Sequence, residues 1–316
     1  MRLFTSLRCV ALSSCAALGV WLSGCAHAPS PSAPLAPPPA TATSQPALPD
    51  MAPPAPLPPG HLDAERAYAL LSRGEPQQAL ALYRHAWEVG NRDRLASYNA
   101  AIAAVRLGAQ AEALSWLERS LENGYRDAAY LRADEDLAPL RSLPEFTALL
   151  ERIPSLPTPA WEVGAHPELK RLVEEDQSDR RPPPKTPEAW KAVSARDTQR
   201  RQRVDALIAA GEARVAADFF AAALVYQHGK APEDHARARE LAAEAARRGH
   251  PGGMWLAAAA WDRWLMNAGL PQRFGTQYKT PPEGGPPQLY TVDPSVPDSE
   301  RQRWGFPPLS EIPKHL

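Results

Sequence analysis

The chain has 316 residues, of which 44% are hydrophobic and 22% are charged, enough for one large domain or two ordinary ones. Its formal net charge of −1 argues against general nucleic-acid binding, which usually needs a clearly basic face, so we predict no nucleic-acid partner. Thirty-six prolines, about twice average usage, indicate that part of the chain does not pack into a core.

The N-terminal residues have the layout of an export signal. Arg2 and Arg8 supply positive charge before a short apolar segment, residues 9–21. That segment is too short for a stable transmembrane helix, and no apolar run in the chain reaches the roughly 18 residues of an ordinary membrane span. We therefore predict a signal peptide over residues 1–24 that is removed on export.

The tetrapeptide Leu22-Ser23-Gly24-Cys25 follows this segment and resembles the bacterial lipobox, in which the cysteine is acylated and becomes the mature N-terminus. The resemblance implies a lipidated Cys25 that holds the protein to the lipid bilayer, because several acyl chains together give stable attachment. The next residue is Ala26 and not aspartate, which implies export to the outer membrane of the cell envelope, facing the periplasm. An ordinary signal peptide with a chance cysteine is the alternative.

Residues 25–60 are predicted to be the lipidated cysteine followed by a disordered tether rich in Pro, Ala, Ser and Thr. Asp50 is the only charged residue from 26 to 60, and large apolar groups are too few to offset the entropy of ordering. Because Pro-rich linkers favour the extended polyproline II form, this stretch is expected to hold the folded part away from the membrane.

Residues 61–153 contain a repeat with a period of 34 residues. Small and turn-forming residues recur at this one offset: Ala67 and Ala101, Gly74 and Gly108, Ala79 and Ala113, Gly90 and Gly124. The period and these residue types resemble the tetratricopeptide repeat (TPR), a helix–turn–helix unit. Apolar residues after the second repeat are expected to close the array: Leu137, Leu140, Phe146, Leu149 and Leu150. An ordinary pair of helical hairpins with accidental spacing is the alternative.

Residues 160–316 are predicted to form a second helical domain with an irregular C-terminal tail. Helices are expected at about 168–179, 187–210, 213–228, 235–249 and 252–268. Thr186 is a suitable N-cap for the second of these, with Pro187 at its first position. Small residues inside and glycine at the breaks resemble the short Sel-like helical repeat. Because no segment alternates as a strand does, we predict an all-α chain, with a TPR-like hairpin array before a Sel-like domain.

Four short polar motifs lie along this second domain: Asp176-Gln177, Gln227-His228, Asp262-Arg263 and Gln272-Arg-Phe-Gly-Thr276-Gln277. Their order resembles that of a bacterial family of unassigned function, whose helical domain carries Asp-Gln, Gln-His, Asp-Arg and a closing Gln-x-Tyr-Gly-Thr-Gln. Phe274 replaces the tyrosine of the closing motif, which removes a hydroxyl group. The resemblance covers about residues 168–310 and implies no particular reaction.

If these motifs converge, their side chains form a polar pocket for a carbonyl, amide or carboxylate ligand. His228 is the candidate general acid or base, because histidine titrates near neutral pH, and Asp176 or Asp262 would orient it. The other candidates are ligand-binding residues: Gln177, Gln227, Arg263, Gln272, Thr276 and Gln277. The alternative is that these groups tie an irregular C-terminal loop to the helices and satisfy its buried backbone.

No metal or cofactor site is predicted. His228, His235 and His250 fit no zinc-binding spacing, and the chain has no phosphate-binding glycine loop, serine elbow or dinucleotide-binding fingerprint. The basic run at 200–203 stands among many acids and is expected to be a solvated helix face.

Two functions from different classes stay open. The leading hypothesis is a membrane-anchored envelope lipoprotein whose repeats form a scaffold for other envelope proteins, since repeat arrays present extended binding surfaces. The second is an enzyme or small-ligand-binding protein that uses the polar pocket of the second domain. Exposed apolar side chains on the inner repeat helices favour the first, and converging accessible polar side chains favour the second.

Overall fold

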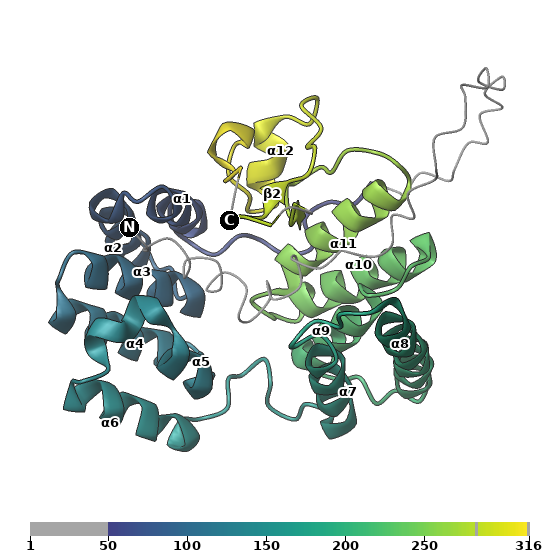
Figure 1. The fold of residues 1–316 in the computed structure, drawn as a ribbon, viewed down its shortest axis with the longest axis horizontal. Coiled ribbons are helices and arrows are strands. Elements are labelled where there is room, and N and C mark those ends of the chain that lie inside the picture. The colour runs from purple at the N-terminus through teal and green to yellow at the C-terminus, as the bar shows by residue number, and fades with distance from the viewer. Residues whose placement is uncertain (1–49, 282–283, 315–316) are drawn as a thin grey trace.

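A computed structural model describes residues 50–281 and 284–314, which form two helical units and a C-terminal segment (Figure 1). This part of the chain is mostly helical, as the all-α prediction requires. The predicted signal peptide, Cys25 and most of the tether lie outside the described residues. Among the helices that are described, none combines the length and apolar character needed to cross a bilayer.

The first unit begins with two helical hairpins, made by α1 (His61–Ser72) with α2 (Pro76–Glu88) and by α3 (Arg94–Arg106) with α4 (Gln110–Glu122). Each hairpin turns at a glycine with positive φ, 80° at Gly74 and 74° at Gly108, a backbone conformation that other residues rarely adopt. Asp93 caps α3 by accepting hydrogen bonds from the backbone N–H groups of Leu95 and Ala96. The two hairpins therefore repeat at the spacing seen in the sequence.

Four short elements close this unit: α5 (Ala128–Ala133), η1 (Glu135–Leu140), α6 (Pro144–Arg152) and η2 (Ile153–Ser155). Their apolar side chains belong to the same core as the hairpins, including Leu137, Leu140 and Phe146. Ten of the thirteen residues of α3 are buried, because α1, α2, α4 and η1 all pack on it. The inner helix of the second hairpin is thus enclosed.

The second unit consists of five helices: α7 (Pro167–Ser178), α8 (Pro187–Ala209), α9 (Ala216–Tyr226), α10 (Pro232–Arg247) and α11 (Gly253–Asn267). Thr186 caps α8 as predicted, since its hydroxyl accepts a hydrogen bond from the Ala189 N–H. The predicted start of α10 at 235 is wrong by three residues. The helix begins at Pro232, a favoured first residue, and Asp234 in its first turn accepts from the Ala231 N–H.

The C-terminal segment packs between α11 and α1 and contains β1 (Tyr278–Lys279), β2 (Gln288–Leu289), α12 (Asp298–Arg303) and η3 (Leu309–Glu311) (Figure 1). The antiparallel pair β1–β2 was not expected, because strands of two residues leave no alternation in the sequence. Phe274, Trp304 and Phe306 join Trp261 of α11 in the core of the second unit.

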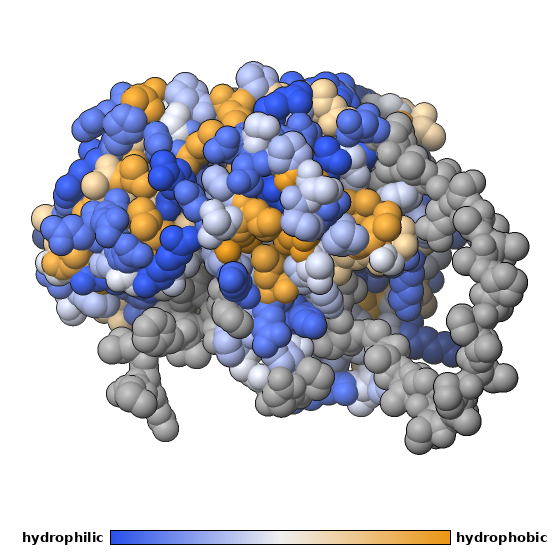
Figure 2. All heavy atoms as spheres, turned by 90° about the horizontal axis from the view of Figure 1, so that it is seen from above, coloured by the Kyte–Doolittle hydropathy of each residue, from blue (hydrophilic) through white to orange (hydrophobic). Residues whose placement is uncertain are grey.

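One close contact joins the C-terminal segment to the repeats. The His61 imidazole of α1 lies 3.0 Å, Nε2 to oxygen, from the Gly305 carbonyl. A Cβ atom at 305 would lie 2.5 Å from the same Nε2, so only glycine fits there. On the face shown in Figure 2, apolar side chains form small groups divided by polar ones.

Candidate functional site

The predicted site residues of the second domain separate into two groups that meet at α11. Asp262, Gln272, Thr276 and Gln277 bond to one another and to the loop after α11, and we call these four residues the loop anchor. Asp176, Gln177, Gln227, His228 and Arg263 lie on the helices themselves or at their ends. The predicted convergence of all the motifs on one pocket is therefore replaced by two separate arrangements.

Asp262 is fully buried, and its carboxylate is surrounded by donors from the loop. It accepts hydrogen bonds from the backbone N–H groups of Arg273 at 2.6 Å, Phe274 at 3.0 Å and Thr276 at 3.1 Å. The Thr276 hydroxyl adds a fourth donor at 2.8 Å. Burial raises the pKa of Asp262, and the hydrogen bonds from the loop oppose that rise.

The side chains of both glutamines of the loop anchor also form hydrogen bonds within the loop region. The Gln272 side-chain amide donates to the carbonyls of Gln277 and Tyr290, and its oxygen accepts from the Gln277 N–H at 2.9 Å. The Gln277 amide donates to the Thr276 hydroxyl oxygen. These hydrogen bonds give the loop anchor a structural role, because they satisfy the buried polar groups of the loop. Asp262 therefore bonds to the loop and does not orient His228.

Asp176 on α7 belongs to a buried network of charges that joins α7 to α8. Its carboxylate accepts from Arg180 at 2.9 Å, and Arg180 in turn reaches Asp197 on α8 at 2.7 Å. Arg200 donates to the other oxygen of Asp197 at 2.9 Å and also contacts Asp179. Each of these guanidinium groups is held by two carboxylates, as buried charges require.

The sequence interpretation missed Arg180, Asp197 and Arg200, and it was wrong to place Arg200 on a solvated face, since only 5% of that residue is exposed. A signal for this burial does exist. Val193, Asp197, Arg200, Val204 and Leu207 follow one another at helical spacing, and all of them are buried. Charged residues inside an apolar stripe of a helix indicate a buried ion pair.

His228 lies beyond the C-terminal end of α9 and faces Asp176, with 3.5 Å between Nε2 and the nearer carboxylate oxygen. Desolvation by burial raises the pKa of Asp176 to about 7. Burial, aided by Arg180 and Arg263, lowers the pKa of His228 well below its usual value, so the imidazole is neutral at pH 7. Of the two carboxylates expected to orient His228, Asp176 is the one that the fold brings to it.

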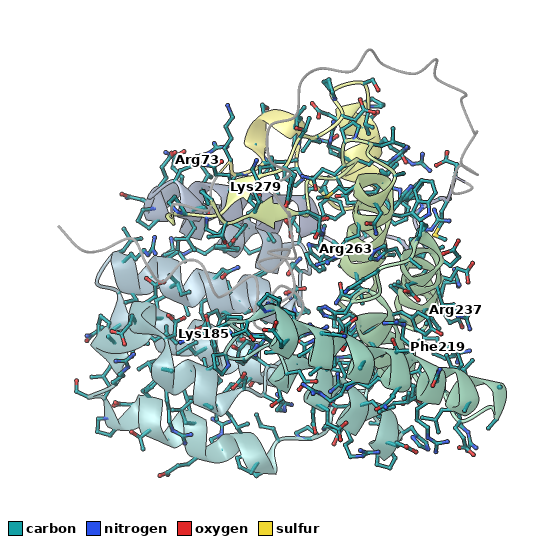
Figure 3. All side chains as sticks on the ribbon, turned by 45° about the vertical axis from the view of Figure 1, so that its right-hand side comes forward. Arg73, Lys185, Phe219, Arg237, Arg263 and Lys279 are labelled. Atoms are coloured by element: carbon teal, nitrogen blue, oxygen red, sulfur yellow. The ribbon has the colours of Figure 1, made fainter. Side chains whose placement is uncertain are left out.

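Four more polar residues, Gln177, Gln227, His235 and Arg263, join Asp176, Arg180 and His228 in what we call the polar cluster. Arg263 extends from α11 toward the middle of the molecule in Figure 3, whereas Arg237 lies on the outer side. Burial, with Arg180 nearby, lowers the pKa of Arg263 to about 10. Gln227 is 1% exposed, and neither atom of its side-chain amide has a hydrogen-bond partner among the described residues.

His235 supplies a pH-dependent term to stability. Burial, with Arg263 and Arg201 nearby, lowers its pKa from 6.5 to about 3. Between pH 6.5 and pH 3, the His235 imidazole is therefore protonated in the unfolded chain but neutral in the folded chain. The contribution of neutral His235 to the free energy of unfolding is complete above pH 6.5 and is lost as the pH falls toward 3. We expect His235→Asn to remove about 2 kcal/mol of the decrease in unfolding free energy between pH 7 and pH 5. Urea titrations at the two pH values measure this, and an unchanged decrease would contradict the assignment.

The polar cluster combines carboxylate, amide, imidazole and guanidinium groups. Within 50–281 and 284–314, no three His, Cys, Asp or Glu side chains are placed to hold a metal ion. Comparisons of the chain with protein-family models, with curated proteins and with solved structures find no match. Function is therefore argued below from the contacts of the chain itself.

Proposed function

We propose that the protein binds a small ligand with a carbonyl, amide or carboxylate group at the polar cluster of its second helical unit. The observation that carries this proposal is the Gln227 amide, which is buried and has no partner among the described residues. Leaving a buried amide unpaired costs about 1–3 kcal/mol for each polar group, so such groups bind a water or a ligand. An amide offers both a donor and an acceptor, which suits a carbonyl or carboxylate compound.

The neighbouring groups support a binding role of the same kind. His228 follows Gln227 in the chain, is neutral and faces Asp176. Its uncharged ring can therefore accept a hydrogen bond from a ligand or donate one to it. Arg263 adds a guanidinium from α11, the kind of group best suited to a carboxylate. Donors and acceptors from α7, α9 and α11 are thus brought to one region.

Gln227→Leu is the variant that separates a ligand-binding amide from a structural one. Leucine has a similar volume and no polar atoms, so in the ligand-free protein this change is expected to raise the free energy of unfolding by about 1–2 kcal/mol. The same variant is expected to lose binding of N-acetylglycine, a small compound with both an amide and a carboxylate, as measured by saturation-transfer NMR.

Gln78→Leu, on the exposed face of α2, is the matched control and is expected to change neither property. A Gln227→Leu protein that is less stable than the wild type would assign the amide a structural role. Equal saturation transfer to N-acetylglycine in the wild type and in Gln227→Leu would count against the ligand site.

The attachment to the membrane is a separate part of the proposal. It rests on the lipobox-like tetrapeptide ending at Cys25 and on the Pro-rich stretch after it. We expect Cys25→Ser to abolish incorporation of a palmitate analogue and to move the protein from the outer-membrane fraction to the soluble fraction, because no thiol is left to acylate. Cys15→Ser, within the predicted signal peptide, is the control; labelling that persists in Cys25→Ser would contradict the assignment.

A scaffold for other envelope proteins is the second candidate function, and a specific surface of the repeats favours it. The partly exposed Trp87 has the Arg92 guanidinium 3.9 Å and the Arg119 guanidinium 4.8 Å from its ring centroid. Val89, 46% exposed, is beside it in the chain. Tryptophan and arginine are the residues that most often dominate binding energy at protein interfaces. The enclosed α3 offers no such surface.

Affinity capture from detergent-solubilised envelopes tests this second function. An envelope protein captured by the wild type is expected to be lost with Trp87→Ala and retained with Leu270→Ala, an exposed apolar residue of the other unit. A set of captured proteins that is the same for both variants would argue against the repeat surface.

A further inference from the structure

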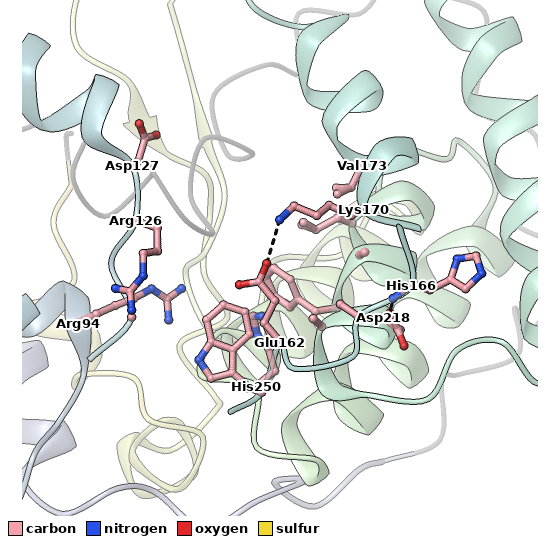
Figure 4. Close-up of a pocket in the computed structure, with 16 residues that line it drawn as sticks. Arg94, Arg126, Asp127, Glu162, His166, Lys170, Val173, Asp218 and His250 are labelled. Carbon is pink, nitrogen blue, oxygen red and sulfur yellow. Dashed lines mark hydrogen bonds and ion pairs between the residues drawn. The ribbon is translucent and has the colours of Figure 1, made fainter. Parts of the chain in front are cut away.

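A cavity of about 280 Å³ lies between the repeats and the second helical unit (Figure 4). Arg94 and Arg126 line it from the first unit, and Trp161, Phe220 and His250 line it from the linker and the second unit. None of the residues around this cavity belongs to the polar cluster, so the two sites are independent. The chemistry of the two sites also differs, because this cavity has two guanidinium groups at one end and aromatic rings opposite them.

Arg94 is a buried cation without an acidic partner among the described residues. It is 6% exposed, and its guanidinium contacts the Trp161 ring at 5.4 Å from the centroid. No hydrogen bond from its side chain to any described residue is found. Burying a charge in this way is costly unless an anion or water completes the site.

Arg126 brings a second guanidinium to the same end of the cavity, where the two groups lie side by side in Figure 4. It is held in place by donation to the backbone carbonyls of Tyr125 at 2.7 Å and Pro157 at 2.9 Å. Burial lowers the pKa of Arg126, and the like charge of Arg94 lowers it further. A bound anion would relieve this repulsion.

The acids around the cavity are already engaged. Glu162 pairs with Lys170 at 3.0 Å, and Asp127 caps α5 through the Tyr130 N–H. Asp218 accepts from three backbone N–H groups of the chain segments before α7 and α9. Glu162 is near enough to Arg126 to oppose the lowering of its pKa, but its hydrogen bond goes to Lys170. The paired guanidiniums are therefore the unneutralised charge of this site.

The opposite wall is aromatic. Phe220 stacks on His250 with ring centroids 3.8 Å apart and an interplanar angle of 16°, and Trp161 meets His250 edge-on at 4.7 Å. Burial and the nearby Arg94 lower the pKa of His250 well below its usual value, and the ring accepts a hydrogen bond from the Gly252 N–H. His250 is thus a neutral, fixed part of the wall.

From this arrangement we propose that the cavity binds a small carboxylate with a flat apolar body. The carboxylate lies on the Arg94 and Arg126 guanidiniums, whose planar donors match its geometry. The apolar body lies against Trp161 and Phe220. The volume is just below the roughly 300–1,000 Å³ of drug-sized pockets, which limits the body to about two fused rings. Residues of both units form the site, so the ligand also stabilises their docking.

Calorimetry of the purified full chain with 2-naphthoate and with 2-naphthamide tests the proposal. The two probes have the same ring system and differ in charge, so the carboxylate is expected to bind at least about tenfold more tightly. Inorganic phosphate, which has no apolar body, is expected to bind more weakly than 2-naphthoate.

Arg94→Gln is expected to abolish the preference for the carboxylate, and Arg94→Lys, which keeps the charge but not the planar fork, to retain part of it. Arg152→Gln, an arginine of the first unit that pairs with Glu118 and does not line the cavity, is the matched control and keeps the full preference. The proposal is overturned if 2-naphthamide binds as tightly as 2-naphthoate to the wild type, if neither binds, or if Arg94→Gln binds 2-naphthoate unchanged. The comparison of 2-naphthoate with 2-naphthamide on the wild-type protein tests the proposal even if a variant does not fold.

Discussion

Replacing Asp262 with alanine is expected to lower the free energy of unfolding by about 4 kcal/mol, one of the two largest effects we predict for this chain. Four donors converge on this buried carboxylate, and alanine leaves all of them without a partner. The loop that these donors belong to also carries Phe274 into the aromatic core beside Trp304. Loosening the loop therefore removes apolar packing as well as hydrogen bonds.

Urea unfolding of Asp262→Ala and Asp262→Asn measures this effect. The asparagine variant is expected to fall between the wild type and the alanine variant, because it keeps one acceptor but turns a donor toward the loop. Glu135→Gln, in an exposed ion pair with Arg141, is the control and should change stability by less than about 1 kcal/mol. A loss below about 1 kcal/mol in Asp262→Ala would mean that the loop is held by other contacts.

Asp197→Ala is the second large effect, with an expected loss of about 3–5 kcal/mol. Asp197 is 4% exposed and lies between the guanidiniums of Arg180 and Arg200. Its removal leaves each guanidinium with one carboxylate instead of two, Asp176 for Arg180 and Asp179 for Arg200, and brings the two buried cations together without the anion between them. The cost of such incompletely compensated charge exceeds the net contribution of the intact pair. Because Arg180 also holds Asp176, the change is expected to disturb the position of Asp176 opposite His228.

A double-mutant cycle of Asp197→Ala with Arg200→Ala, followed by urea unfolding, measures the coupling. We expect the double variant to be less destabilised than the sum of the single variants, since removing a cation together with its carboxylate leaves less unpaired charge. Glu112→Ala, which breaks the more exposed pair with Arg84, is the control. Additive losses within about 0.5 kcal/mol would contradict a coupled buried network.

The polar cluster and the loop anchor differ in whether their side chains have hydrogen-bonding groups without a partner. In the loop anchor, Asp262, Gln272 and Thr276 all bond to the chain itself, so a ligand would have to displace the loop. In the polar cluster, the Gln227 amide has no partner among the described residues, although it is buried. Residues that look alike in the sequence are therefore assigned different roles.

The sequence predicted the local structure well, because local signals determine it. Glycines at fixed offsets mark the hairpin turns, Thr186 with Pro187 marks the start of α8, and helical spacing marks the buried faces. Each of these features depends on the φ and ψ preferences and hydrogen bonds of a few neighbouring residues. The small shift in the start of α10 has the same origin, since an aspartate serves equally well before a helix or in its first turn.

The candidate site was predicted only in part. Asp176 and His228 were expected to work together, and the fold brings them to 3.5 Å; Asp262 was expected beside them and is instead committed to the loop. The roles of Arg180, Asp197 and Arg200 escaped prediction because a charged residue at a given helical position has the same local preference whether its face is solvated or covered.

The sequence by itself determined that this chain is mostly helical, where its hairpins turn, and which motifs carry polar chemistry, since those properties depend on residues close together in the chain. Only the tertiary structure decided which polar groups are satisfied. Whether Asp262 meets a loop backbone, or Arg94 lies beside Arg126 at one end of the cavity, depends on segments distant in sequence. Burial makes these contacts decisive for stability. In a low-dielectric interior, a paired charge interacts more strongly than in water, and an unpaired charge costs more free energy.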